Sequence, residues 1–114
     1  MTVYVDDMRA SYRGMVMCHM IADTDEELHA MAARIGVARR WFQKPGTERR
    51  HYDICLSKRT AAVAAGAVEI TWRQTGAMVA HRRAHGKLGT PLEAEAWHRG
   101  HLAYKRGMAE GSAA

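Results

Sequence analysis

A well-formed helix start at Thr24 fixes the position of one helix and the order of the elements around it. The Thr24 hydroxyl can accept a hydrogen bond from the backbone N–H of Glu27 while the Glu27 carboxylate reaches back, which is the pattern of a capping box. Apolar residues then recur at helical spacing up to Ile35, and Gly36 supplies a left-handed stop. The sequence therefore predicts a helix over 24–35.

Short apolar runs on both sides of this helix predict strands. The run over 3–5 is β-branched and aromatic, whereas the run over 15–22 is apolar but too short for an independent helix. Residues 9–14 between them have the composition of a turn. The bulky pair Trp41 and Phe42 suits another short strand. We expect strands at 3–5, 15–22 and 37–43, with a turn over 44–47 after the last of them.

A second helix and a further strand follow. Alanine is abundant over 60–65, which favours a helix that begins near Asp53 or Ser57 and packs closely on a sheet. Residues 67–73 alternate between apolar and polar with a period of two, as in a strand. The order strand, strand, helix, strand, helix, strand requires at least one right-handed crossover. The predicted fold class is α/β, with a small single sheet of about four strands, at least partly parallel, and packed helices.

The C-terminal part of the sequence predicts a helix joined to this domain by a linker. Residues 74–89 contain internal glycines and many charges, which is typical of a linker. Thr90 and Pro91 then open a helix with both a capping box and a proline at the first helical position. We expect an α/β domain over 1–73, a linker over 74–89 and an extra C-terminal helix over 90–110.

Length and composition narrow the class of protein. The 114 residues fit a single domain. The sequence has no apolar run of the roughly 18 residues that a membrane span needs, and its start lacks the basic and apolar regions of a signal peptide. Cys18 and Cys55 lie outside any CxxC pattern and are expected to be buried thiols. We therefore expect a cytoplasmic protein without a membrane partner.

The charge of the chain is unevenly distributed. The net charge of +5 comes from 17 Lys and Arg against 12 Asp and Glu, and basic residues crowd the middle of the sequence. Such clustering raises the local concentration of phosphates, so a nucleotide or a nucleic acid is an expected partner. A solvated basic surface without any partner is the alternative.

Short motifs occur in a fixed order along the first two thirds of the chain, at 3–7, 18–23, 27–29, 40–43, 51–53 and 66–68. In this combination the stretch from Val3 to Trp72 resembles the DUF4031 family, a domain of unknown function met in bacteria, notably actinobacteria, and in their phages. The resemblance implies no established activity. A fainter similarity is to PIN-like nucleases, in which an aspartate follows the first strand and an alanine-rich helix leads into a strand like 66–71. That pattern normally continues into an aspartate, whereas here Trp72 follows.

Acidic residues and histidines gather where the predicted strands and helices meet. In a parallel α/β sheet, ligands bind beyond the carboxyl ends of the strands. Side chains that follow parallel strands would therefore converge at one edge of the sheet. The residues expected there are Asp6, Asp7, Gln43 and Arg73, with His51 and Asp53 on the loop that leads into the next helix.

These residue types suit metal-dependent chemistry on a phosphate. The carboxylates of Asp6, Asp7 and Asp53 could hold Mg²⁺ or Mn²⁺, with His51 as base or phosphate contact. In the alternative interpretation the acids only end a strand and cap a helix. The catalytic candidates are Asp6, Asp7, His51 and Asp53, and the ligand-binding candidates are His19, His29, Gln43, Lys58, Arg59 and Arg73. A zinc site from Cys18, His19, His51 and Cys55 is a further alternative.

Two functions fit these residues. The first is a small phage or bacterial protein that binds a nucleotide or a nucleic-acid phosphate, with divalent-metal-dependent phosphodiester hydrolysis. The second is a non-enzymatic module that binds a protein or a small ligand through the basic middle and the last helix. Trp97, Tyr104 and Met108 share a face of that helix with His101, and packing against the domain or a second subunit would explain this stripe. We therefore expect that the C-terminal helix can support a homodimer.

Overall fold

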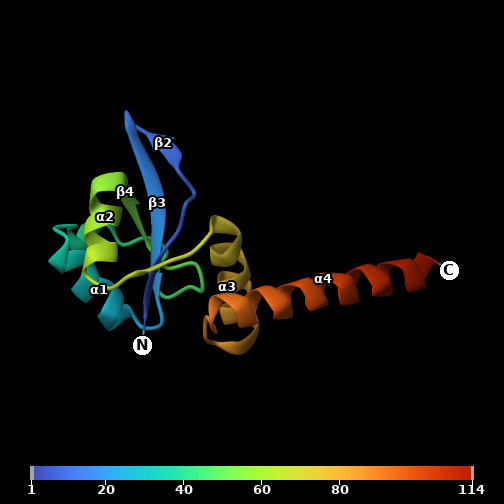
Figure 1. Ribbon diagram of the computed structural model, residues 1–114. Helices are drawn as coiled ribbons and strands as arrows, with labels where there is room; N and C mark the ends of the chain where they lie inside the picture. The colour runs from blue at the N-terminus through green and yellow to red at the C-terminus, as the bar shows by residue number, and fades with distance from the viewer. Residues whose placement is uncertain (1, 114) are drawn as a thin grey trace.

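One long strand organises the sheet of this protein, whose computed structural model describes residues 2–113 (Figure 1). Strand β3 (Met15–Ala22) pairs along one edge with β4 (Tyr52–Cys55), and along the other edge with β1 (Val3–Val5) and β2 (Ala10–Tyr12). These pairings are all antiparallel. Strand β5 (Val68–Glu69) adds to β1 in parallel and completes a sheet of five strands. The prediction of a single, partly parallel sheet is therefore confirmed.

The two faces of the sheet carry separate apolar cores because successive side chains of a strand point to opposite faces. Val5, Met20 and Tyr52 point to the face covered by helices α1 (Asp25–Arg34) and α2 (Leu56–Ala64). Tyr4 and Ile21 point to the other face, where they meet helix α3 (Trp72–His85) and the start of helix α4 (Pro91–Ala113). The sheet is thus a central layer between two groups of helices.

The first helix begins and ends as predicted. Thr24 is its N-cap and accepts a hydrogen bond from the backbone N–H of Glu27 at 3.2 Å. The carboxylate of Glu27 accepts from the Thr24 hydroxyl at 2.9 Å instead of reaching the backbone N–H. Gly36 follows the helix with φ of +80°, the left-handed conformation that glycine adopts without strain.

Two of the predicted elements near the hairpin and the first helix differ in the structure. Residues 9–14, predicted as a turn, contain β2 and a tight hairpin turn in which Arg13 and Gly14 both have positive φ. Residues 37–43, predicted as a strand, contain the 3₁₀-helix η1 (Arg39–Trp41), and only Gln43 pairs, as an isolated bridge to His51. The bulky pair splits here, because Phe42 packs on the first core while Trp41 is 55% exposed.

The second half of the sheet also differs from the prediction. The segment from His51 to Asp53 is not a loop, because Tyr52–Cys55 forms β4 and the following helix begins only at Leu56. The strand predicted over 67–73 is limited to β5.

Helix α3 begins at Trp72, and the segment 74–89, predicted as a linker, supplies most of it. The physical reason is a reciprocal capping box between Thr71 and Gln74, which starts a helix inside the alternating pattern.

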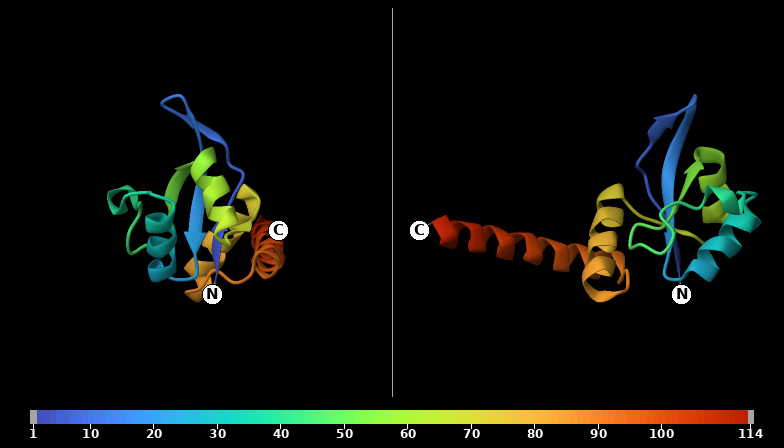
Figure 2. Two further views of the ribbon diagram at one scale, coloured as in Figure 1. Left: turned by 60° about the vertical axis from the view of Figure 1, so that its left-hand side comes forward. Right: turned by 180° about the vertical axis from the view of Figure 1, so that it is seen from behind.

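The predicted C-terminal helix is present as α4, which runs away from the sheet and packs against α3 only near its start (Figures 1 and 2). The described part of the molecule measures 55 × 30 × 23 Å along its principal axes, and α4 supplies much of the longest dimension. Within residues 2–113, none of the helices has the length and apolar character that crossing a bilayer would require.

Candidate metal centre

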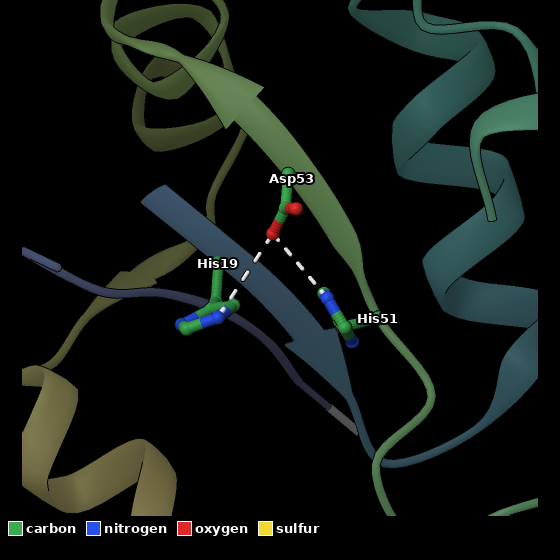
Figure 3. Close-up of side chains that lie close together, drawn as sticks. All are labelled: His19, His51 and Asp53. Carbon is green, nitrogen blue, oxygen red and sulfur yellow. Dashed lines mark ion pairs between the residues drawn. The ribbon is translucent and has the colours of Figure 1, made fainter. Parts of the chain in front are cut away.

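Three ligand-bearing side chains meet on the face of the sheet that α3 only partly covers. His19 on β3 lies directly across from Asp53 on β4 in the antiparallel register, and His51 is the residue before β4 begins. Nε2 of His51 lies 3.3 Å from Oδ1 of Asp53, and Nε2 of His19 lies 3.9 Å from the same oxygen (Figure 3). One ligand atom from each residue lies within 4.8 Å of the others. The group is hereafter called the His19–His51–Asp53 centre.

Hydrogen bonds on the far side of each ring fix the tautomers of the two histidines. Nδ1 of His51 lies 2.6 Å from the carbonyl oxygen of Arg49, which can only accept, so this nitrogen carries the hydrogen. Nδ1 of His19 lies 2.8 Å from a carboxylate oxygen of Asp6 and donates to it for the same reason. In the neutral form, each ring therefore points the lone pair of Nε2 toward Asp53.

Asp6 holds His19 in place and is not itself one of the three converging ligands. Its side chain is fully buried, and its two oxygens accept from the backbone N–H groups of Met8 and His19, from Nδ1 of His19 and from the hydroxyl of Thr75. Burial alone would raise the pKa of Asp6, but these hydrogen bonds outweigh it and hold the pKa below its ordinary value. Asp6 is thus a carboxylate at neutral pH, and its lone pairs are largely used within the fold.

Asp53 has one oxygen engaged and one without a hydrogen-bond partner. Oδ2 accepts from the side-chain amide of Gln43 at 2.8 Å, whereas Oδ1 is buried and accepts no hydrogen bond of good geometry. The approach of His51 lowers the pKa of Asp53, burial opposes this effect, and Gln43 lowers the pKa further, so the group is a carboxylate. Buried polar atoms in folded proteins almost always have a partner. Oδ1 is therefore a buried, negatively charged atom without a hydrogen-bond donor, and a bound cation would compensate its charge.

A single positive charge between the three side chains would resolve their mutual repulsion. A proton on His51 is one such charge. Burial lowers the pKa of His51, but the Asp53 carboxylate and the Arg49 carbonyl more than offset this effect, so the pKa is raised. A proton on Nε2 of His51 would leave the lone pair of His19 still facing the same oxygen. A metal ion would instead be shared by all three ligand atoms.

The donor set indicates which metals fit. Two imidazole nitrogens and one carboxylate oxygen are typical of Zn²⁺, Mn²⁺, Fe²⁺ and Co²⁺, whereas Mg²⁺ prefers oxygen ligands alone. Histidine ligands of such metals usually donate their other N–H to a carboxylate or a backbone carbonyl. His19 and His51 have these partners in Asp6 and the Arg49 carbonyl. Three protein ligands would leave further coordination positions open to water or substrate.

The centre is reachable from solvent. The side chains of His19, His51 and Asp53 are 26%, 15% and 31% exposed. Asp53 and its partner Gln43 line a cavity of about 900 Å³, which continues past Met17 and Cys55 toward the tip of the β2–β3 hairpin. This space is called the hairpin cavity. A ligand in it would contact Asp53, the residue of the centre that lines the cavity.

The structure brings some of the predicted site residues together and separates others. Asp53 contacts His19, His51 and Gln43, and Asp6 lies behind His19. Lys58 lines the hairpin cavity. The centre lies within the sheet and not beyond the carboxyl ends of parallel strands, because β3 and β4 pair in antiparallel fashion.

Four candidates have other roles in the fold. Asp7 accepts from the backbone N–H of Trp72 at 2.7 Å and so caps the start of α3, on which Arg73 is exposed. Arg59 donates to the backbone carbonyl of Asp6 and pairs with Glu69.

His29 lies on the opposite face of the sheet, where its Nδ1 contacts the Tyr52 hydroxyl at 2.7 Å and its ring packs edge-on against Phe42. Burial, helped by the charge of Arg39, lowers the pKa of His29. His29 is thus a core-facing polar residue of the first helix layer.

The alternative zinc site does not assemble. Cys18 is buried on the α1–α2 side of the sheet, next to His19 in sequence but on the other face. Cys55 follows Asp53 on β4 but is not among the converging ligand atoms. Both cysteines are free thiols, but only Cys18 is buried as predicted, whereas Cys55 is partly exposed.

Sequence reasoning missed Thr75 altogether. It also missed the pairing of His19 with Asp53, although the polar, apolar, polar order of His51, Tyr52 and Asp53 is a short strand pattern.

Comparison with known proteins gives a family but no activity. The model of the family described as protein of unknown function (DUF4031) matches residues 3–82, which is more than half of the chain. No curated protein and no solved structure matches the chain. The fainter similarity to PIN-like nucleases finds no support, and α3 begins at Trp72, where those nucleases would continue into an aspartate. The resemblance seen in the motifs from Val3 to Trp72 is thereby confirmed, and the chain belongs to the DUF4031 family of proteins of unknown function.

Proposed function

We propose that this protein is a divalent-metal-dependent hydrolase that acts on a phosphoester of a nucleotide or a nucleic acid. One observation carries the proposal: Nε2 of His19 and Nε2 of His51 both face the buried, unpartnered Oδ1 of Asp53. In proteins, two imidazole nitrogens and a carboxylate oxygen that face one another are usually ligands of a shared metal ion. The reaction centre is therefore the His19–His51–Asp53 centre, and Asp6 acts as the residue that positions His19.

The metal expected on sequence grounds changes with this geometry. Carboxylates alone would have suited Mg²⁺ or Mn²⁺, whereas two imidazoles favour Mn²⁺ or Zn²⁺ over Mg²⁺. A metal ion bound by three protein ligands lowers the pKa of a bound water and supplies a hydroxide near neutral pH. His19, His51 and Asp53 would hold the ion, and Asp6 and the Arg49 carbonyl fix the tautomers of the two histidines.

The charge around the hairpin cavity supports a phosphate-bearing substrate. Arg13, Arg40 and Lys58 line it, and Asp53, which the metal would neutralise, is the only acidic residue among its lining residues. Cationic side chains around a concave site raise the local concentration of anions. A phosphoester would thus be attracted to the cavity and held beside Asp53, which is one of the three residues that would hold the metal.

The alternative function is a non-enzymatic binding module, and one observation favours it. Leu102, Tyr104 and Met108 on α4 are 50%, 64% and 58% exposed, so this helix presents large apolar side chains to solvent. A protein partner or a second copy of the chain would cover them, in line with the homodimer expected from the sequence. A cytoplasmic location is part of both proposals, and the free thiols of Cys18 and Cys55 support it.

Metal titration tests the proposal. Chelator-stripped protein would be titrated with Mn²⁺, Zn²⁺ and Mg²⁺ by isothermal calorimetry, and hydrolysis of bis(p-nitrophenyl) phosphate would be followed at saturating metal. We expect one tight Mn²⁺ or Zn²⁺ per chain, with Mg²⁺ much weaker, and loss of binding and turnover in His51→Ala and Asp53→Asn.

His85→Ala is the matched control, because it removes an exposed histidine of α3 outside the centre. Metal affinity and turnover should be unchanged in this variant. Saturable metal binding without turnover on any phosphoester would favour the binding module. Metal affinity equal to that of the wild type in His51→Ala and Asp53→Asn would refute the proposal that these residues bind a metal.

A further inference from the structure

The walls of the hairpin cavity carry two exposed aromatic rings. Tyr12 lies at the end of β2, in the hairpin that extends beyond the helices in Figure 1, and Trp41 lies in η1. Their side chains are 52% and 55% exposed, although both line the same cavity. Large aromatic side chains left open in a concave site are characteristic of places where a planar ligand stacks.

Each of these rings has an arginine beside it. The guanidinium carbon of Arg13 lies 5.3 Å from the centre of the Tyr12 ring, and that of Arg40 lies 5.3 Å from the centre of a Trp41 ring. The cavity lining therefore contains two platforms, each made of an aromatic ring and an arginine, which come from segments far apart in the sequence. In each pair, the ring could stack on a base while the adjacent cation contacts a phosphate.

We propose that the hairpin cavity binds single-stranded nucleic acid, with successive bases stacked on Tyr12 and Trp41 and the strand passing the His19–His51–Asp53 centre. Aromatic platforms in a basic groove are the usual means of holding single strands, because every base has a face to stack and its phosphate needs a cation. The inference rests on the proposed function and deepens it by naming the substrate class.

A single strand fits these features better than a free nucleotide or a duplex. A mononucleotide has one base and can occupy only one of the two platforms. In a duplex the bases are stacked within the helix and are not available to side chains. The cavity of about 900 Å³ lies near the upper end of the range for small-ligand pockets, so it has room for more than one nucleotide.

The remaining lining agrees with this occupant. Met8, Met15 and Met17 add apolar, adaptable side chains to the cavity. Lys58 adds a third cation next to the two arginines, whereas Asp53 at the centre is the only acid in the lining. An acidic protein segment would use the cations but would leave both aromatic platforms unmatched, so the pairing of rings with cations favours nucleic acid.

Fluorescence anisotropy with labelled ten-nucleotide strands tests this inference on the chelated, metal-free protein. We expect binding of single-stranded RNA or DNA to be at least about tenfold tighter than binding of a blunt duplex or of a mononucleotide. The RNA and DNA arms, with the same base sequence, decide which strand is preferred. Affinity should fall with salt with a log–log slope of about −0.7 for each phosphate contacted.

Substitutions on the two platforms provide the decisive comparison. Tyr12→Ala and Trp41→Ala should each weaken strand binding at least about fivefold, whereas Tyr12→Phe and Trp41→Phe should stay within about threefold of the wild type. Tyr104→Ala, which removes an exposed aromatic from α4 outside the cavity, is the matched control and should bind normally. Equal affinity for strand and duplex, or wild-type affinity in both platform alanine variants, would overturn the inference.

Failure of strand binding and failure of the proposed hydrolysis can be told apart. Strand binding is measured in the presence of chelator, so it is read independently of any metal-dependent turnover. Strand binding without turnover would support the inference and count against the hydrolase. Turnover of a small phosphodiester without any strand binding would support the hydrolase and refute the inference.

Discussion

The hydroxyl of Thr75 on α3 donates a 2.8 Å hydrogen bond to Oδ2 of Asp6, the oxygen that also accepts from Nδ1 of His19. The contact is buried and joins residues that lie 69 positions apart. Helix α3 therefore takes part in orienting a metal-ligand candidate although it supplies no ligand itself. The family match, which ends at residue 82, includes this helix contact.

Thr75→Val is expected to weaken both folding and metal binding. Removal of a buried hydroxyl that bonds to a charged group should lower the free energy of unfolding by about 1–3 kcal/mol. Loss of a group that holds the partner of a histidine ligand typically lowers metal affinity about tenfold or more. Urea unfolding and Mn²⁺ titration measure the two effects. Thr75→Ser keeps the donor and should restore affinity, and an unchanged affinity in Thr75→Val would show that α3 has no influence on the centre.

Asp6 should make the metal-free protein sensitive to acid. The pKa of Asp6 is lowered in the folded state, so its contribution to stability is fully present above its ordinary pKa of about 3.9 and is lost as the pH falls through the lowered value. Asp6→Asn removes this titration. In chelator, the difference in unfolding free energy between wild type and Asp6→Asn should narrow as the pH falls below about 4. A difference that widens in acid would contradict this account.

His29 should act on stability without acting on metal binding. Its pKa is lowered, so the unfolded chain binds more protons than the folded one just below the ordinary pKa of about 6.5, and stability should fall as the pH drops through that region. In His29→Gln this decrease of stability with falling pH should be absent. Thermal unfolding between about pH 7.5 and 5 tests the effect. Because His29 lies on the opposite face of the sheet, Mn²⁺ affinity should equal that of the wild type, and a reduced affinity would place this residue in the site after all.

Arg82 is a buried charge without a carboxylate partner among the described residues. It is 4% exposed, donates to the backbone carbonyls of Ala22 and Glu48 and leaves Nε unpaired, and burial lowers its pKa to about 10. Arg82→Met keeps most of the volume, and the lost hydrogen bonds are offset by removal of the buried charge, so the change in unfolding free energy should stay within about 1 kcal/mol. Arg82→Ala also leaves a cavity, so this variant should lower the free energy of unfolding by about 2 kcal/mol. Guanidinium-induced unfolding of the two variants measures these free energies. Equal losses of stability in Arg82→Met and Arg82→Ala would show that the charge itself stabilises the fold.

Local signals were enough to predict some elements of the fold. The capping box at Thr24 and the left-handed Gly36 each depend on a few neighbouring residues, so α1 was predicted nearly to the residue. The apolar runs at 3–5 and 15–22 likewise became β1 and β3. Helix α3 was missed because its capping residues, Thr71 and Gln74, lie within a run that alternates like a strand.

The candidate site was predicted only in part, for a different reason. His51 and Asp53 were selected correctly as neighbours, and they remain in contact. The role of His19 depends on the antiparallel pairing of β3 with β4, which is a long-range choice that no local pattern encodes. The assumed parallel arrangement therefore placed Asp7 and Arg73 in the site, where the structure has a helix cap and an exposed side chain.

His19 and Asp53 are direct cross-strand partners, so the separation of their side chains is set by the spacing of the sheet. A ligand set built on paired strands needs little rearrangement to receive an ion, in contrast to one assembled from loops. Uptake and release of metal should then proceed at the rate of ligand exchange, with an almost unchanged far-ultraviolet circular dichroism spectrum. The metal-free and the metal-bound protein would then differ in charge but share the same backbone structure.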